Sequence, residues 1–163
     1  MSDHPLRVLV LCTGNSCRSI LGEALINHLG SGRLQAFSAG SHPVGQVNPN
    51  ALACLARHGL PVEGYSSKSW DALDTIPFDL LISVCDSAAG EACPLYLGQV
   101  ARGHWGLHDP AHATGTPENI AAAFDQTYAA LERRIRQLLD LPFEHMTAAE
   151  RVAAVNRIGQ DTP

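Results

Sequence analysis

The sequence predicts an α/β protein of three layers: a central four-stranded parallel sheet with helices on both faces, plus a C-terminal helix. Two observations support this. Short, continuous apolar runs, typical of strands buried on both faces, alternate with longer segments whose apolar residues recur at helical spacing. Strands that alternate with helices in this way build parallel sheets. We expect one catalytic domain over residues 1–140 and a helical extension over residues 141–163.

The first predicted unit is a strand, a tight loop and a helix. The strand covers Arg7 to Cys12, with a continuous apolar run in its centre. The loop follows as Thr13-Gly14-Asn15-Ser16, and a helix is expected from about Arg18 to Leu29, ended by Gly30. This succession is the usual opening of an α/β fold.

The middle of the chain continues the same alternation. We expect strands at residues 34–38, 78–85 and 103–107, a helix from Asn48-Pro49 to Gly59, and a short helix at residues 70–73. The carboxyl ends of parallel strands are where ligands bind in such sheets. Cys12, Cys85 and the segment around Asp109 are all expected at that edge.

Two further helices are predicted toward the C-terminus. Thr116 caps a long helix with Pro117 at its first position, where proline is favoured. The cluster Arg133, Arg134 and Arg136 is interpreted as the solvated last part of this helix. Residues 147–150 form a capping-box pattern before a terminal helix, which docks either on the domain or on a partner.

Composition narrows the possible partners. The net charge of −5 argues against a nucleic-acid partner, which usually requires a basic face. The longest apolar run is too short to cross a membrane, and the acidic Asp3 before it argues against a signal peptide. We therefore expect a cytoplasmic protein with no membrane partner. An odd count of five cysteines then favours reactive or redox thiols over a disulfide framework.

A metal ion or cofactor is not expected. The cysteine spacings fit zinc motifs poorly, and Pro110 interrupts the helical spacing of His104, His108 and His112. Cys54 lies one helical turn before His58 and is interpreted as a buried structural thiol.

The segment Cys12-Thr13-Gly14-Asn15-Ser16-Cys17-Arg18-Ser19 has the composition of an oxyanion-binding loop. Successive backbone N–H groups at a helix N-terminus attract negative charge, and Arg18 adds a bidentate donor. Gly14 would allow the tight turn, and Asn15 tolerates left-handed backbone angles. The same field favours the thiolate of Cys12, to which Ser19 is placed to donate a hydrogen bond. We expect residues 13–18 to bind the anion and Cys12 to attack it.

The chain resembles the low-molecular-weight protein tyrosine phosphatases and the arsenate reductases built on the same fold. The motifs are the loop of residues 12–19, Ser38-Ala39-Gly40 and residues 104–110 (His-Trp-Gly-Leu-His-Asp-Pro), and the resemblance spans residues 6–140. It implies that Cys12 is the nucleophile, Arg18 the oxyanion clamp and Asp109 the acid that protonates the leaving oxygen. From the residues alone, an aspartate before a proline suits a turn equally well.

Cys85 and Cys93 favour the reductases, because a reductase must supply two electrons and thiols are a protein's own source. The resemblance implies a relay in which Cys85 releases arsenite from Cys12, Cys93 takes over the disulfide, and thioredoxin or glutaredoxin reduces it. Phosphate would compete with arsenate. Ala111 stands where tyrosine phosphatases generally carry an aromatic residue after Asp-Pro. The alternatives are a phosphatase and a non-catalytic redox sensor or binding module.

Two details of the loop region stay open. Some relatives bind potassium through residues that match Asn15, Glu23 and Ser38 together with an aspartate, and this chain has Lys68 in that stretch instead. Lys68 is therefore a candidate to supply the positive charge. Cys17 is either a small residue at the helix start or a partner that protects Cys12 in a reversible disulfide.

Overall fold

A four-stranded parallel sheet forms the centre of the computed structural model, which describes residues 5–84 and 100–161. Its strands are β1 (Leu6–Leu11), β2 (Leu34–Ala39), β3 (Leu80–Ser83) and β4 (Ala101–His104), in the order β2-β1-β3-β4. In the register, Val8 of β1 lies between Ala36 of β2 and Leu80 of β3. The predicted sheet is confirmed, including the placement of β3 beside β1.

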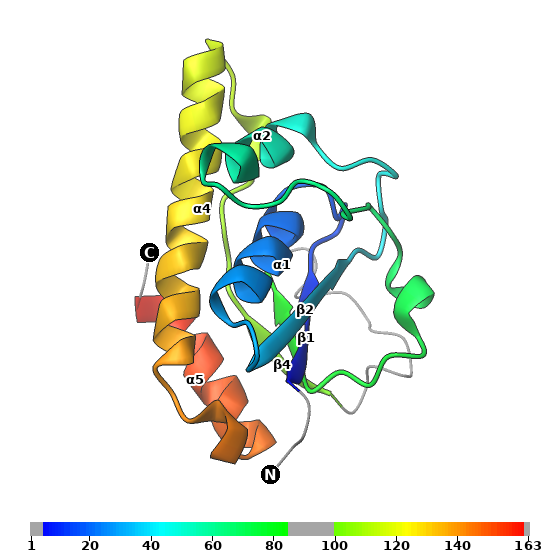
Figure 1. Cartoon of the computed structure of the whole chain (residues 1–163), viewed down its shortest axis with the longest axis vertical. Coiled ribbons are helices and arrows are strands. Elements are labelled where there is room, and N and C mark those ends of the chain that lie inside the picture. Colours follow the sequence, from blue (N-terminus) through cyan, green and yellow to red (C-terminus); the bar gives the residue numbers. More distant parts are fainter. Residues whose placement is uncertain (1–4, 85–99, 162–163) are drawn as a thin grey trace.

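One face of the sheet carries the larger core and all four α-helices of the described residues (Figure 1). These are α1 (Arg18–Leu29), α2 (Pro49–Arg57), α4 (Pro117–Leu139) and α5 (Ala148–Asp161). Val8, Val10 and Ile82 point from the sheet into this core. Alternate residues of a strand point to opposite faces, so the intervening side chains must be covered separately.

The opposite face is covered by a short 3₁₀ helix, η1 (Trp70–Leu73), and the segment after it. Leu9, Leu11 and Leu81 of the sheet pack there with Leu73 and Phe78. In the described part of the chain the helices on the second face are thus reduced to η1.

Most predicted elements lie within two residues of their observed bounds, and their ends follow local chemistry. The side chains of Asn48 and Thr116 accept hydrogen bonds from backbone N–H groups two and three residues on, each followed by a proline. The fourth strand is the main correction, since β4 ends at His104 and not at residue 107. Beyond His104 the chain turns inward, and the indole Nε1 of buried Trp105 donates to the carbonyl of Val155 at 2.7 Å. Two short 3₁₀ helices, η3 (Pro110–His112) and η4 (Phe143–His145), were not predicted.

The C-terminal helix α5 docks on the edge strand β4, which answers the question left by the sequence. Asn156 Oδ1 accepts from the backbone N–H of His104 at 2.8 Å. A Cβ atom at Gly103 would lie 2.5 Å from Cγ1 of Val155, so only glycine allows this close approach. The division of the chain at residue 140 itself stays a prediction.

The interpretation of Arg134 as a solvated residue was wrong. Its side chain is buried, and its guanidinium donates to the carbonyl of Gly106 at 3.1 Å, which holds the segment after β4 against α4. Burial lowers its pKa, and the neighbouring Arg133 lowers it further. Arg136, in contrast, is exposed and pairs with Glu132 at 3.4 Å.

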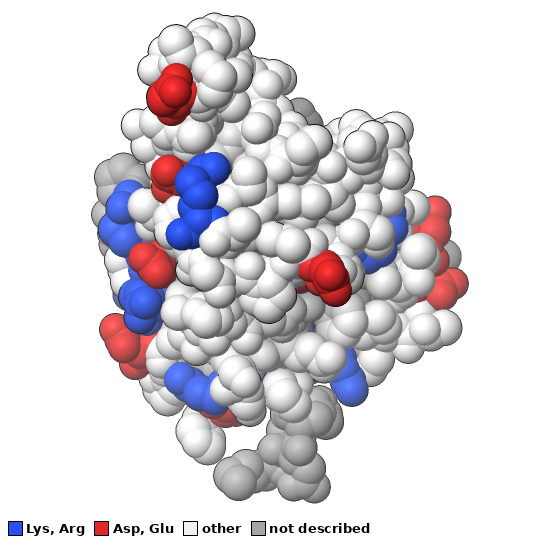
Figure 2. All heavy atoms as spheres, turned by 45° about the horizontal axis from the view of Figure 1, so that its top comes forward, with Lys and Arg blue, Asp and Glu red and all other residues white. Residues whose placement is uncertain are grey.

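The face drawn in Figure 2 shows basic and acidic side chains interspersed among uncharged ones. Within the described ranges 5–84 and 100–161, no helix has the length and apolar character needed to span a bilayer.

Candidate functional site

The predicted oxyanion loop connects β1 to α1 and begins at Cys12, which is buried at the end of β1. The segment of residues 42–48 holds this loop from outside. Its backbone N–H groups donate to the carbonyls of Thr13, Gly14 and Ser16 at 3.0–3.1 Å. These hydrogen bonds fix the backbone of the loop at the N-terminus of α1, where N–H groups attract anions.

Gly40 lets β2 approach this loop closely. A Cβ atom there would lie 2.4 Å from the carbonyl oxygen of Thr13 and 2.7 Å from that of Cys12. Any larger residue would push the loop away from the end of the sheet. The glycine of the Ser38-Ala39-Gly40 motif therefore has a steric role.

Asn15 holds the loop in shape. Its φ of 49° lies in the left-handed region, as expected, and its side chain is fully buried. Its Nδ2 donates to Ser19 Oγ at 2.8 Å, and its Oδ1 accepts from the backbone N–H of Lys68 at 2.9 Å. Gly14 lies in a bend of the loop but does not adopt a positive φ. Glycine at that position instead leaves room for Val44, whose Cγ1 would lie 3.3 Å from an added Cβ.

Arg18 and Asp109 lie together, although 91 positions separate them in the sequence. An Nη of Arg18 donates to the carbonyl of Leu107 at 3.0 Å, and the other lies 3.3 Å from the Asp109 carboxylate. The Nε of Arg18 is buried and has no hydrogen-bond partner among the residues that the structure describes. A buried donor without a partner costs about 1–3 kcal/mol, and an anion bound beside it would remove this cost.

Asp109 has the turn role considered from the sequence, and its carboxylate also faces the oxyanion loop. One carboxylate oxygen accepts from the backbone N–H of Ala111 at 3.0 Å and caps η3, which is the turn role. The other faces Arg18 and lies 3.6 Å from Nε2 of His112. The cap fixes the side chain where it meets the guanidinium of the loop.

Comparison with known proteins assigns the chain to a family. Residues 7–153 match the model of the family described as low molecular weight phosphotyrosine protein phosphatase. The chain belongs to this family. An arsenate reductase of Shouchella clausii is 34% identical over 139 residues, which cover 82% of this chain and 94% of that protein.

Two similar solved structures share this fold, and one is named an arsenate reductase and the other a tyrosine phosphatase. An arsenate reductase in the phosphate binding state has a TM-score of 0.68 at 25% identity, covering 83% of this chain and 97% of the other. The tyrosine phosphatase Wzb from Escherichia coli K30, in complex with sulphate, has a TM-score of 0.65 at 27% identity, covering 82% and 96%.

The position that matches a family potassium site holds an electrostatic pair in this chain. Glu23 accepts from the hydroxyl of Ser38 at 2.5 Å. Burial raises the pKa of Glu23, while Ser38 and the charge of Lys68 lower it. Burial lowers the pKa of Lys68, and the charge of Glu23 opposes that shift. The Lys68 ammonium donates to the carbonyl of Ser66 at 3.0 Å, and a role for it in supplying positive charge here stays a prediction.

Cys17 occupies the N-cap position of α1, which fits its interpretation as a small residue at the helix start. Burial raises the pKa of its thiol, partly offset by a contact with the Ser16 hydroxyl at 3.7 Å. A thiol kept neutral in this way is a poor nucleophile.

Cys85 and Cys93 lie outside the described residues. The residues just before Cys12 and Cys85 are joined, since the N–H of Val84 donates to the carbonyl of Leu11 at 2.9 Å. The two chain segments that lead to these cysteines therefore run side by side in neighbouring strands β1 and β3.

Sequence reasoning missed two supports of the site. Ser67 Oγ donates to the carbonyl of Gly14 at 3.0 Å, and Ser83 Oγ lies 2.7 Å from Nδ1 of His104 across the ends of β3 and β4. Ser67 belongs to a serine-rich stretch typical of a loop, and only its place beside Gly14 gives it a role. No local pattern marks Ser83, and nothing in the sequence pairs it with His104.

Proposed function

We propose that this protein is an arsenate reductase that uses Cys12 to capture arsenate and a cysteine relay to reduce it to arsenite. The observation that carries the proposal is the buried Nε of Arg18, which no described residue pairs with, on the first residue of α1 and beside Asp109. An anionic ligand with several oxygens fits such a donor. The names of similar proteins support arsenate in particular, because relatives that are 34% and 36% identical to this chain are called arsenate reductases.

The loop binds the oxyanion in the first step. The N–H groups of residues 13–18 and the guanidinium of Arg18 receive the arsenate oxygens, and Ser19 donates to the sulfur of Cys12. Ser19 Oγ already accepts from Asn15, so its own hydrogen is available for the sulfur. Phosphate has the same shape and charge and competes for the site.

Covalent capture follows. The thiolate of Cys12 attacks arsenic, an S–As bond forms, and one arsenate oxygen leaves as water after protonation by Asp109. The Arg18–Asp109 contact supports this role, because it holds the carboxylate beside the guanidinium that receives the arsenate oxygens. Arsenic remains in the +5 state at this stage.

The two electrons come from thiols in the second step. The thiolate of Cys85 attacks the sulfur of Cys12, an S–S bond forms, and the S–As electron pair stays on arsenic, which leaves as arsenite. Cys93 then attacks Cys85, freeing Cys12 and leaving a Cys85–Cys93 disulfide. Thioredoxin or glutaredoxin reduces that disulfide. The hydrogen bond between Val84 and Leu11 supports the pairing of the first two cysteines, because it joins the residues that precede them.

A coupled assay tests the proposal. Arsenate, thioredoxin, thioredoxin reductase and NADPH are supplied, and NADPH loss is followed for wild type and for Cys12→Ser, Cys85→Ser and Cys93→Ser. Each substitution should stop turnover, while Cys93→Ser should still release one equivalent of arsenite. Cys54→Ser, which changes a buried cysteine of α2 outside the loop and the relay, serves as a matched control and should keep turnover. Multiple turnovers by Cys85→Ser would refute the relay.

A phosphatase is the second candidate, because Cys12, Arg18 and Asp109 are sufficient for hydrolysis of a phosphate ester and a similar structure is a tyrosine phosphatase. Ala111 argues against aryl substrates, since it offers no ring to stack on them. Aryl phosphate hydrolysis faster than arsenate reduction, and unaffected by Cys85→Ser, would favour this candidate.

A further inference from the structure

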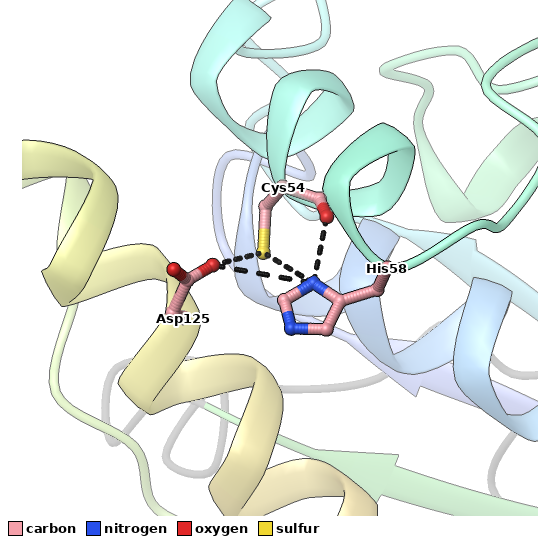
Figure 3. Close-up of side chains that lie close together, drawn as sticks. All are labelled: Cys54, His58 and Asp125. Carbon is pink, nitrogen blue, oxygen red and sulfur yellow. Dashed lines mark hydrogen bonds and ion pairs between the residues drawn. The ribbon is translucent and has the colours of Figure 1, made fainter.

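A cysteine, a histidine and an aspartate converge on the side of α2 that faces α4 (Figure 3). Cys54 Sγ lies 3.4 Å from Asp125 Oδ1 and 3.9 Å from His58 Nδ1. His58 Nδ1 and Asp125 Oδ1 are 4.0 Å apart. The sequence suggested only the first two residues as neighbours, because Asp125 is 71 positions away from Cys54.

The fold fixes these three side chains from different directions. Cys54 and His58 are one helical turn apart, at the end of α2, and Asp125 lies on α4. The His58 ring stacks on Tyr128, with ring centroids 3.8 Å apart and planes 17° from parallel. The thiol of Cys54 is buried, whereas a third or more of each of the His58 and Asp125 side chains is exposed. The cluster is therefore closed at the sulfur and open to solvent on its other side.

The spacing is close to that of a tetrahedral zinc site. Zinc binds sulfur at about 2.3 Å, and nitrogen and oxygen at about 2.0–2.2 Å. At tetrahedral angles these lengths separate sulfur from the other two ligands by about 3.6 Å, and nitrogen from oxygen by about 3.4 Å. The largest difference from the structure is about 0.6 Å, between His58 and Asp125. A small rotation of the partly exposed His58 and Asp125 side chains removes this difference.

The reactivity of Cys54 argues against a redox or nucleophilic role for the cluster. Burial, and next the neighbouring Asp125, raise the pKa of this thiol to about 12. A nucleophilic cysteine needs the opposite shift. The case for a metal therefore rests on the distances between the three side chains, since a bound cation deprotonates a coordinating thiol.

We infer that Cys54, His58 and Asp125 form a binding site for one Zn²⁺ ion, with water as the fourth ligand. Thiolate, imidazole and carboxylate are the ligands that zinc takes in proteins, and a thiolate with a carboxylate neutralises its two charges. The ion joins α2 to α4. Because Asn48, the N-cap of α2, donates its N–H to Ser16, the site steadies the outer support of the oxyanion loop.

Binding requires a defined exchange of protons and partners. The Cys54 thiol releases its proton to solvent, and the S–H hydrogen bond to Asp125 is replaced by two bonds to zinc. Nδ1 of His58 now faces the carbonyl of Cys54 at 2.8 Å and must exchange that contact for the metal, with its proton carried on Nε2. Arg57, 2.8 Å from Asp125 Oδ1, moves to the second carboxylate oxygen.

Co²⁺ and Zn²⁺ titrations test the site. To remove the other thiols, the full chain carries Cys12→Ser, Cys85→Ser and Cys93→Ser. Cobalt should bind with a stoichiometry of about one and give a thiolate charge-transfer band, since a Cys54 thiolate is the source of that band. Adding Cys54→Ser should abolish the band, and adding Cys17→Ser, the matched buried cysteine, should keep it. A band that is missing from the three-serine protein, or that survives Cys54→Ser, would overturn the inference.

Competition with a chromophoric chelator measures the zinc affinity independently of the cysteines. Asp125→Asn and His58→Gln should each weaken Zn²⁺ binding by about 100-fold or more, since changes outside the ligand shell alone cost about 10–100-fold. Both side chains are partly exposed, so these variants are expected to fold. His28→Gln, an exposed histidine on α1, should leave the affinity unchanged. Equal affinity of wild type and Asp125→Asn would exclude the site. None of these measurements depends on the arsenate reaction.

Discussion

Replacement of Asn15 by glycine and by alanine separates its backbone role from its side-chain role. Glycine keeps the left-handed conformation at φ 49° but loses both side-chain hydrogen bonds. Alanine loses the same bonds and must also hold a conformation that residues with a Cβ atom avoid. Both substitutions act at a fully buried position, so water cannot simply replace the lost partners.

The expected cost follows from these contacts. Loss of the bond to Ser19 costs about 1 kcal/mol, and a Lys68 N–H left without its acceptor costs about 1–3 kcal/mol. The lost hydrogen bonds alone should therefore reduce the free energy of unfolding by about 2–4 kcal/mol in both variants. Left-handed strain adds about 1–2 kcal/mol for alanine, while glycine loses about 0.4–1 kcal/mol through its freer unfolded chain. Asn15→Ala should be less stable than Asn15→Gly by about 1 kcal/mol.

Urea unfolding at neutral pH measures both differences. Gly14→Ala is the matched control, because Gly14 has no positive φ and its added Cβ would meet only the flexible Val44 side chain at 3.3 Å. That variant should lose less than about 1 kcal/mol. If Asn15→Ala were more stable than Asn15→Gly, the left-handed strain would be disproved. If Asn15→Gly were as stable as wild type, the two hydrogen bonds would have no role in stability.

Three further predictions concern other parts of the molecule. Arg18→Lys should lower kcat/KM for arsenate about 10–10⁴-fold, because one or two charge-assisted hydrogen bonds of about 1.5–3 kcal/mol each are lost; a change under tenfold in the coupled assay would contradict this. Arg33 lowers the pKa of Glu144 to about 2, so the pair stabilises the fold above the ordinary carboxyl pKa and the effect is lost as pH falls toward 2. Both side chains are over a third exposed, so Glu144→Gln should cost only about 1 kcal/mol or less at pH 7, and urea curves should converge with wild type at low pH. Gly103→Ala should cost about 1–3 kcal/mol because its Cβ would lie 2.5 Å from Val155, and Val155→Ala added to it should recover part of the loss; a purely additive thermal shift would contradict the docking of α5.

The sequence could predict what is local and periodic. Continuous apolar runs identified β1 and β3, and residues 48 and 116 marked helix starts through their own capping chemistry. The left-handed residue of the oxyanion loop was also predictable, because asparagine tolerates that conformation. The strand at residues 101–104 was misplaced because its bounds depend on packing against α5 and not on its own pattern.

Contacts between residues far apart in the sequence could not be predicted, because no local pattern marks the residues that make them. Arg134 lies in a charged run on a helix, and only the tertiary fold shows that it is buried against Gly106. Asp125 likewise reads as a solvated helix residue until α2 packs against α4. Lys68 contacts Asn15 through its backbone N–H, which no side-chain pattern encodes. In each case the partner is decided by how elements pack, and the identity of the residue gives no sign of it.

The oxyanion loop and the source of electrons make separate demands on the chain. Capture of a tetrahedral anion needs a rigid loop. Here N–H groups of residues 42–48 bind the loop carbonyls, the Asn15 side chain bonds to Ser19, and Gly40 lets the end of β2 approach the loop closely. The same loop serves equally well for phosphate ester hydrolysis, so its geometry cannot distinguish a phosphatase from a reductase. The difference has to come from thiols that reach Cys12 after capture. For this reason arsenite release by the Cys93→Ser protein is the measurement that separates the two functions. The relay predicts one equivalent of arsenite and no more. A phosphatase would release no arsenite, and a reductase that does not use the relay would release arsenite over many turnovers.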